Sequence, residues 1–566
     1  MMRIFPILLI AACGSIAPAE AQTSSFSPAQ MVFKSTGRAS GEAWVLEGGG
    51  YVGTYLQVQQ VGRVNGMVRA SGPPGTAMAV AVADSRSRFA VTEQENDYPF
   101  SVSLPPGIYF LRIELPAAAG DRSLAVHHLQ VQGAAVLNDA SDATALAAAD
   151  SYIEHFRRGP GEMVLDGVSP GTSVRVRLRR HAFNFGGVIH GFTKNDFLVQ
   201  NPAPGSDADK FQQFVRSHFN MLVASNGGKW QYNEQDRDVV TMEFVDQCLS
   251  FAERLGMRSR MHALLWDFKV QQPRWVNELL SKALDGGDPD AAQAAREELK
   301  QEIRERIDYY VRARARRYVE LDVLNEPYHE ADWWKALGPQ GIAEVFRWTE
   351  DAVRQAGADT RLYLNEYNVF QWSRLPGKVS GQQQADPDPY ANWYRELFEQ
   401  ILSLGGPVSG VGIQYYVDKR PDADRSSPHS AAHLTRVLQN LSVTGLPISL
   451  TEFGIKPDTP PEVSADVLED TMRIIFGTPQ AQTFLMFGFW AGSMWDQAPS
   501  AALVDKDWNL TPVGQRYEQL MKRWTTDIQT TADEDGKVRF VGFWGDYEVV
   551  VGDRIVKFTH ARDRSR

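Results

Sequence analysis

The sequence has no apolar run of the roughly 20 residues that a membrane-spanning helix needs. The N-terminal run Phe5–Ala12 is too short to span a bilayer. It follows the positively charged Arg3 and precedes Ala19–Ala21, which fits a small-x-small cleavage site. Residues 1–21 therefore indicate a signal peptide, and we expect a secreted or periplasmic protein.

Cysteine is scarce, with 2 residues in 566, Cys13 and Cys248. Cleavage after Ala21 would leave Cys248 alone, so we expect no intramolecular disulfide. Cys13 ends a segment that resembles a bacterial lipoprotein box, which makes a lipid anchor at Cys13 the alternative to free export. Cys248 shares an apolar helical stripe with Phe251 and Leu255, and this pattern predicts a buried, inert thiol.

The sequence also lacks the residue patterns of metalloenzymes and nucleic-acid-binding proteins. It has neither an HExxH motif nor closely spaced His and Cys ligands, so we expect no metal and no cofactor. Calcium in the N-terminal region stays open by analogy with some binding modules. The net charge of −11 disfavours binding to a phosphate backbone and is compatible with a neutral polysaccharide.

A chain of 566 residues is too long for one typical domain. Residues 30–137 contain short apolar runs separated by Gly, Pro and Asn, which predict a β-sandwich. A bridging helix and strands follow at 138–180. The tail at 526–566 predicts a small C-terminal β appendage, and pairing of this tail with the N-terminal sandwich is an open alternative.

The glycines at Gly48–Gly53 fit a GxGxxG pattern, but a strand-like segment follows them, so we interpret them as a loop and not a dinucleotide site. The sandwich loosely resembles the jelly-roll carbohydrate-binding modules of polysaccharidases. Trp44, Tyr51 and Tyr55 are candidates for stacking on sugars. The alternative is that they are ordinary core aromatics.

Residues 181–525 alternate between strand-like and helix-like segments, which favours the α/β class and a (β/α)8 TIM barrel. A doubly wound open sheet is the alternative fold. The pattern predicts eight strands, at His181–Val188, Asn220–Asn226, Ser259–Asp267, Tyr318–Glu326, Arg361–Val369, Val408–Val417, Leu446–Ile455 and Thr483–Trp490.

Two of these predicted strands carry a glutamate near their C-terminal end. Glu326 follows Asp322–Asn325 on the fourth strand, and Glu452 follows Pro447–Thr451 on the seventh. The C-terminal ends of barrel strands meet at one mouth. A pair of carboxyl groups there is typical of glycosidases, in which one carboxyl is the acid and the other the nucleophile.

At these residues the chain resembles glycoside hydrolase family 10, the endo-β-1,4-xylanase family, from about Ala182 to Tyr517. The resemblance implies that Glu326 is the acid/base and Glu452 the nucleophile of a retaining enzyme. It implies that Asn325 bonds the sugar 2-hydroxyl. Tyr416 stands where the family has a histidine that contacts the nucleophile, and its hydroxyl could still donate a hydrogen bond to Glu452. The other implied substrate-binding residues are Asn226, Lys229, His262, Trp266, Gln414, Trp490 and Trp495, although the tryptophans and His262 are also compatible with wall packing.

Three positions depart from the family pattern. Tyr416 stands where a histidine is usual, Asp267 replaces the histidine after Trp266, and Ser225 replaces a glutamate. Retaining chemistry therefore follows more directly from the resemblance than xylan specificity does. We expect a monomer that cleaves β-1,4-linked polysaccharide, most simply xylan. The alternatives are a glycosidase for a bacterial exopolysaccharide and a non-catalytic carbohydrate-binding barrel.

Overall fold

The structure is a computed structural model, and it describes residues 23–116, 122–189, 197–224, 226–371, 387–417, 429–495 and 499–562. The predicted signal peptide, the candidate lipid anchor at Cys13 and the departure at Ser225 lie outside these residues. Within the described ranges, no helix combines the length and the apolar character needed to cross a membrane.

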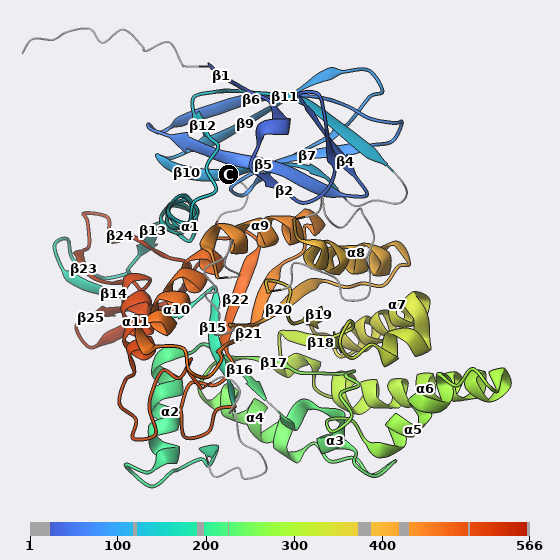
Figure 1. Cartoon of the computed structure of the whole chain (residues 1–566). Helices are drawn as coiled ribbons and strands as arrows, with labels where there is room; N and C mark the ends of the chain where they lie inside the picture. Colours follow the sequence, from blue (N-terminus) through green and yellow to red (C-terminus); the bar gives the residue numbers. More distant parts are fainter. Residues whose placement is uncertain are drawn as a thin grey trace, which may run out of the picture.

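Eight parallel strands close into a barrel (Figure 1). The closure confirms the predicted (β/α)8 fold and the count of eight, and the open-sheet alternative is wrong. The strands, in barrel order, are β15 (Asn184–Ile189), β16 (Met221–Ala224), β17 (Arg258–Met261), β18 (Glu320–Asn325), β19 (Arg361–Glu366), β20 (Gly410–Val417), β21 (Ile448–Ile455) and β22 (Ala481–Met486).

The third strand ends earlier than predicted, at Met261 instead of Asp267. Beyond Met261 the chain leaves the regular ladder but still follows its neighbour. The amides of Leu264 and Leu265 donate to the carbonyls of Asp322 and Val323 at 2.8 and 3.1 Å. The apolar run after β17 therefore forms the wall of the barrel mouth, which explains why it has the pattern of a strand.

Helices with one apolar face surround the strands. The predicted stripe Ile342, Val345, Phe346 and Val353 is buried, and Cys248 is also buried, as predicted. Burial raises the pKa of the Cys248 thiol. The barrel helices are α2 (Asp207–His218), α3 (Trp230–Asn233), α4 (Glu243–Arg254), α5 (Arg274–Ala283), α6 (Pro289–Ile307), α7 (Asp332–Gln355), α8 (Pro389–Ser403), α9 (Ala431–Leu441), α10 (Pro461–Phe476) and α11 (Pro512–Arg523).

The N-terminal region forms the predicted β-sandwich, with an apolar core between two antiparallel sheets. The glycines Gly48 and Gly49 form a bend, and β5 begins at Gly50. One sheet has the order β3 (Arg38–Ser40), β4 (Ala43–Glu47), β11 (Ser123–Gln132), β6 (Gly62–Ser71) and β9 (Asn96–Leu104), with β1 (Thr23–Phe26) on β11. The other has the order β12 (Ala135–Leu137), β5 (Gly50–Val58), β10 (Gly107–Leu115), β7 (Ala77–Val82) and β8 (Ser85–Ala90), with β2 (Phe33–Lys34) on β5.

The sandwich packs against the barrel at α8 and α9, and this contact explains the aromatic residues of β5 (Figure 1). Tyr51 and Tyr55 are fully buried there with Phe33 and Val443. The Tyr51 hydroxyl donates to the carbonyl of Arg436 at 2.9 Å. The hypothesis that Tyr51 and Tyr55 stack on sugars is therefore wrong, because the barrel covers both rings.

Trp44 lies elsewhere in the sandwich and is partly buried. Its indole N–H donates to the carbonyl of Thr36 at 2.8 Å, and the ammonium of Lys34 lies 4.0 Å from its ring centroid. The N–H edge of the Trp44 indole and part of one of its faces are therefore already in contact with the protein.

A charge cluster reinforces the contact between sandwich and barrel. The fully buried carboxylate of Glu114 accepts hydrogen bonds from Arg112 at 2.6 Å and from Arg86 at 2.5 Å. Arg112 also donates to Gln439 of α9, and Arg86 donates to the carbonyl of Val443 at 3.0 Å. One carboxylate therefore holds two guanidinium groups that both reach across the interface.

The C-terminal strands pair with the segment that the sequence placed between sandwich and barrel. This unit has its own core, so the alternative in which the tail joins the N-terminal sandwich is wrong. Helix α1 (Asp142–Phe156) leads into it. The strand β13 (Arg158–Val164) pairs with β24 (Lys537–Phe543), and the other sheet has the order β23 (Asp527–Thr531), β14 (Ser173–His181), β25 (Gly545–Val551) and β26 (Arg554–His560).

Replacement of Glu114 by alanine tests the charge cluster. The change leaves Arg86 and Arg112 without their shared carboxylate, and we expect the free energy of unfolding to fall by about 3–5 kcal/mol. Urea unfolding measures the loss. Asp97→Ala is the matched control, because it removes the partner of Arg69 on the exposed face of the sandwich and should change stability little. A loss for Glu114→Ala as small as that of the control would contradict this role of the cluster.

Candidate active site

The two glutamates belong to one network of polar side chains at the barrel mouth. Glu326 directly follows β18, and Glu452 lies within β21. Both are largely buried, with 9% and 6% of their surface exposed. The strands between them, β19 and β20, contribute Asn365 and Gln414, which bond to one or other glutamate.

The carboxyl group of Glu326 is held at both oxygens. The indole N–H of Trp266 donates to Oε2 at 3.0 Å, and the side-chain amide of Gln414 donates to Oε1 at 2.9 Å. Burial raises the pKa of Glu326 to about 8, and the negative charges of Glu366 and Glu452 add to the rise. This carboxyl group therefore keeps its proton at neutral pH.

Glu452 is surrounded by hydrogen-bond donors. The side-chain amide of Asn365 donates to Oε1 at 3.4 Å, and Nδ1 of His262 lies 3.9 Å from the same oxygen. The Tyr416 hydroxyl donates to Oε2. Burial and the charge of Glu452 raise the pKa of Tyr416 well above its usual value, so Tyr416 is a neutral donor.

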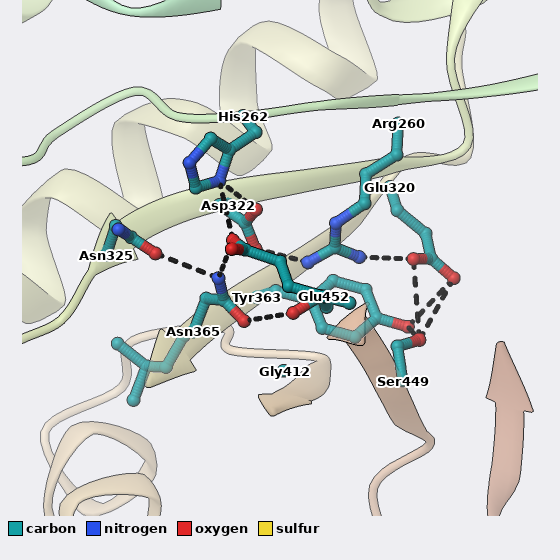
Figure 2. Close-up of polar contacts among 12 residues, drawn as sticks. Arg260, His262, Glu320, Asp322, Asn325, Tyr363, Asn365, Gly412, Ser449 and Glu452 are labelled. Carbon is teal, nitrogen blue, oxygen red and sulfur yellow. Dashed lines mark hydrogen bonds and ion pairs between the residues drawn. The ribbon is translucent and has the colours of Figure 1, made fainter. Parts of the chain in front are cut away.

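A chain of buried charges continues from Glu452 into the barrel interior (Figure 2). Nδ1 of His262 lies 2.9 Å from Asp322. Arg260 bonds Asp322 on one side and Glu320 on the other, and all three are nearly inaccessible to solvent. The one guanidinium thus compensates two carboxylates below the mouth, and Asp322 orients His262 toward Glu452.

Asn325 is fully buried beside Glu326. Its Oδ1 accepts from Asn365 at 2.8 Å and from Gln414 at 3.2 Å, which fixes the orientation of the amide. Its Nδ2 has no hydrogen-bond partner among the described residues. A buried amide without a partner is costly, and a hydroxyl group of a ligand would satisfy it.

The predicted residues Asn226, Lys229 and Trp266 come together at one side of the mouth. The Lys229 ammonium donates to Oδ1 of Asn226 at 2.9 Å and lies 4.7 Å from the centroid of the Trp266 ring. Burial lowers the pKa of Lys229 to about 8, although Glu452 and Glu326 oppose the change. The negative charges of Glu452 and Glu326 thus stabilise the ammonium form of Lys229 against the effect of burial.

The two predicted tryptophans near β22 have different surroundings. Trp495 is 38% exposed and lies 5.1 Å from the ring of Tyr416, so it offers an open aromatic face next to Glu452. The described ring contacts of Trp490 are instead with Trp508, stacked at 4.5 Å, and Phe197. Trp495 thus lies beside the residue that bonds Glu452, whereas Trp490 packs between other aromatic rings.

Asp267, which replaces the usual histidine after Trp266, bonds to the start of a helix. Its Oδ2 accepts from the backbone amides of Asp332 and Trp333, the latter at 3.1 Å, at the start of α7. Burial raises the pKa of Asp267 to about 7, and these two amides oppose the rise. Asp267 therefore caps the first turn of α7.

Sequence reasoning missed several residues of the site. Asp322, Asn365 and Glu366 lie on strands that carried motifs, but their contacts depend on which strands are neighbours. Phe487 contacts Tyr416 and Trp495 at 5.5 and 6.0 Å between ring centroids. Phe487 directly follows β22, and its apolar side chain gave no signal that distinguished it from a core residue. Among the described residues, no group of three or more His, Cys, Asp or Glu is placed to hold a metal ion.

Comparison with protein families agrees with this geometry. The model of Glycosyl hydrolase family 10 matches residues 192–519, more than half of the chain. The chain belongs to glycosyl hydrolase family 10. Membership confirms the resemblance that the motifs predicted, including the glycoside hydrolase class. The match covers the barrel from α2 to most of α11 and leaves the first barrel strand, β15, and the N-terminal sandwich outside it.

Individual relatives are distant. The chain is 27% identical over 379 residues to "Anti-sigma-I factor RsgI6" of Acetivibrio thermocellus, a match that covers 67% of this chain and 42% of that protein. It is 24% identical to "Endo-1,4-beta-xylanase 1" of Arabidopsis thaliana, with 67% and 34% covered. The solved structure of native xylanase 10B from Thermotoga maritima is 22% identical, has a TM-score of 0.46 and covers 60% of this chain and 95% of its own. The chain spans less than half the length of the two curated relatives.

Proposed function

We propose that this protein is a secreted retaining β-glycoside hydrolase that cleaves β-1,4-linked polysaccharide, with Glu326 as acid/base and Glu452 as nucleophile. The observation that carries the proposal is the different state of the two carboxyl groups. Glu326 is buried with a pKa raised to about 8, whereas Glu452 lies among the donors Tyr416 and Asn365. One carboxyl is suited to give a proton and the other to act as an anion.

In the first step, Glu452 attacks the anomeric carbon and Glu326 protonates the departing glycosidic oxygen. The bond between the anomeric carbon and that oxygen breaks, and an ester between Glu452 and the sugar forms. In the second step, Glu326 removes a proton from water, and the resulting hydroxide attacks the anomeric carbon. The ester bond breaks, and both carboxyl groups return to their starting states.

The same geometry explains how Glu326 can change from acid to base. Formation of the ester removes the negative charge of Glu452, which is one of the charges that raise the pKa of Glu326. The pKa of Glu326 then falls, and its proton leaves with the first product. Glu326 is therefore ionised when water enters.

The residues around the pair are suited to holding a sugar. The unpaired Nδ2 of Asn325 would bond the 2-hydroxyl of the sugar next to Glu452. Lys229 and Asn226 offer a donor and an acceptor to further hydroxyl groups, and Trp495 offers a face for stacking. Several relatives are named endo-1,4-beta-xylanases, which supports xylan as the first polymer to test.

Digestion of a panel of β-glycans, with sizing of the products, tests the proposal. We expect release of oligosaccharides from xylan or a related β-1,4-linked chain, and loss of hydrolysis with retained binding in Glu452→Ala. Products from a bacterial exopolysaccharide and none from xylan would favour the second substrate class. A wild-type protein that binds but cleaves none of the polymers would favour a binding barrel and sink the proposal.

Glu326→Gln tests the acid/base role. We expect kcat/KM on glycosides with poor leaving groups to fall by about 10²–10⁴-fold, and the loss to be much smaller on activated aryl glycosides, which need little acid help. In the wild type, kcat/KM should fall as the pH rises through about 8, because Glu326 loses the proton that it must donate. The variant should lack this fall. Equal losses on both kinds of substrate would refute the assignment.

Tyr416→Phe tests the contact with Glu452. The change removes a hydrogen bond to a charged oxygen, and we expect kcat/KM to fall by about tenfold to a hundredfold. Tyr415→Phe is the matched control. It removes the hydroxyl of the next residue in the chain, which lies 2.9 Å from Nδ1 of His429 on the other side of the strand. If Tyr416→Phe keeps both the rate and the pH profile of the wild type, Tyr416 has no part in the mechanism.

A further inference from the structure

A second buried carboxylate lies behind Glu326, on the next strand of the barrel. Glu366 ends β19 and is fully buried. Its Oε2 accepts from the backbone amide of Tyr328 at 2.9 Å, and its Oε1 accepts from the backbone amide of Tyr367 at 2.8 Å. Glu366 therefore ties together the turn that follows Glu326 and the end of its own strand.

The turn after Glu326 needs such an anchor. Glu326 has a φ of +54°, a left-handed conformation that costs a residue with a side chain about 1–2 kcal/mol. Its backbone amide donates to the carbonyl of Asn365 at 2.7 Å, and its carbonyl accepts from the amide of Glu330 at 2.9 Å. The contacts of Asn365 and Glu366 thus hold the one backbone conformation that directs the Glu326 side chain into the mouth.

His329 completes the anchor, and its tautomer follows from its partners. Nε2 lies 3.3 Å from Nδ2 of Asn368, which can only donate, so Nε2 accepts. Burial lowers the pKa of His329 to about 4, so the ring is neutral and its proton is on Nδ1. Nδ1 then donates to Oε1 of Glu366 at 2.9 Å. The ring also stacks on Tyr367 with 3.6 Å between centroids.

We propose that Glu366 and His329 are positioning residues for Glu326: they fix the turn that carries it and place a second ionisable carboxyl group behind it. Burial raises the pKa of Glu366 to about 8, whereas its N–H donors and the Tyr390 hydroxyl favour the ionised form. Glu366 and Glu326 therefore titrate over the same pH range as a coupled pair. Since the charge of Glu366 contributes to the high pKa of Glu326, the anchor helps the acid keep its proton. This inference rests on the proposed acid/base role of Glu326.

Other ionisable groups face the same carboxyl groups. Glu452 contributes a negative charge to Glu326 in the free protein, and Lys229 contributes a positive one. Substitutions at His329 and Glu366 leave Glu452 and Lys229 in place, so a change in the pKa of Glu326 can be assigned to His329 and Glu366. Among the described residues, the other ionisable groups around Glu326 and Glu366 are Tyr416, Tyr367, Glu330, Tyr328, Tyr390 and Tyr394.

Two substitutions at His329 separate the donor from the ring. Asparagine places Nδ2 near the position of Nδ1 and can still donate to Glu366, whereas leucine cannot, and both lose the stack on Tyr367. We expect His329→Leu to move the alkaline limb of kcat/KM to lower pH by about one unit, the size of a nearby charge effect. His329→Asn should stay close to the wild type. Glu366→Gln should move the limb at least as far as His329→Leu.

The measurement is kcat/KM between pH 5 and 10 on an aryl glycoside, together with titration of the Glu326 carboxyl by ¹³C NMR in the full-length chain. In Glu366→Gln the new side-chain amide would face the N–H of Tyr328, and two donors in contact could prevent folding. In that case the comparison of His329→Leu with His329→Asn still tests the proposal. The proposal would be overturned if His329→Leu changed neither the alkaline limb of kcat/KM nor the NMR titration of Glu326. Equal shifts in the leucine and asparagine variants would overturn it as well. An inactive wild type would sink the proposed function, while the NMR titration would still test the anchor.

Discussion

The polar interior of this barrel depends on the buried charge of Arg260. Glu320 and Asp322 are both inaccessible to solvent, and an unpaired carboxylate at such a depth is strongly destabilising. Arg260 bonds both of them. Through Asp322 it also orients His262, which faces Glu452 (Figure 2). The site at the mouth is thus the upper end of a charge network that starts in the barrel interior.

The two glutamates differ because of their neighbours and not because of their position on a strand. Glu326 has other carboxyl groups nearby and little solvent, so its proton is retained. Glu452 has hydrogen-bond donors from Asn365 and Tyr416. Two chemically identical side chains are thereby suited to the opposite tasks that we propose for them, and Glu366 adds a second buried carboxyl group behind Glu326.

The N-terminal sandwich is part of the same packed body as the barrel. Its aromatic residues Tyr51 and Tyr55, together with the cluster around Glu114, are used for contact with α8 and α9 (Figure 1). Aromatic residues in a domain that resembles a carbohydrate-binding module are therefore not evidence of sugar binding by themselves. Whether an aromatic ring is free for a ligand depends on what packs over it.

The sequence by itself determined the elements of the barrel and singled out the two glutamates at its mouth. Alternating apolar patterns gave the eight strands, and the glutamates at Glu326 and Glu452 were recognisable because each ends a local run. The tertiary structure decided everything that depends on contact between distant segments: the anchor of Glu366 at Tyr328, the capping of α7 by Asp267, the burial of Tyr51 and the stacking of Trp490 on Trp508. Periodicity reports which face of a strand is apolar, but a partner tens or hundreds of residues away is chosen only when the barrel closes.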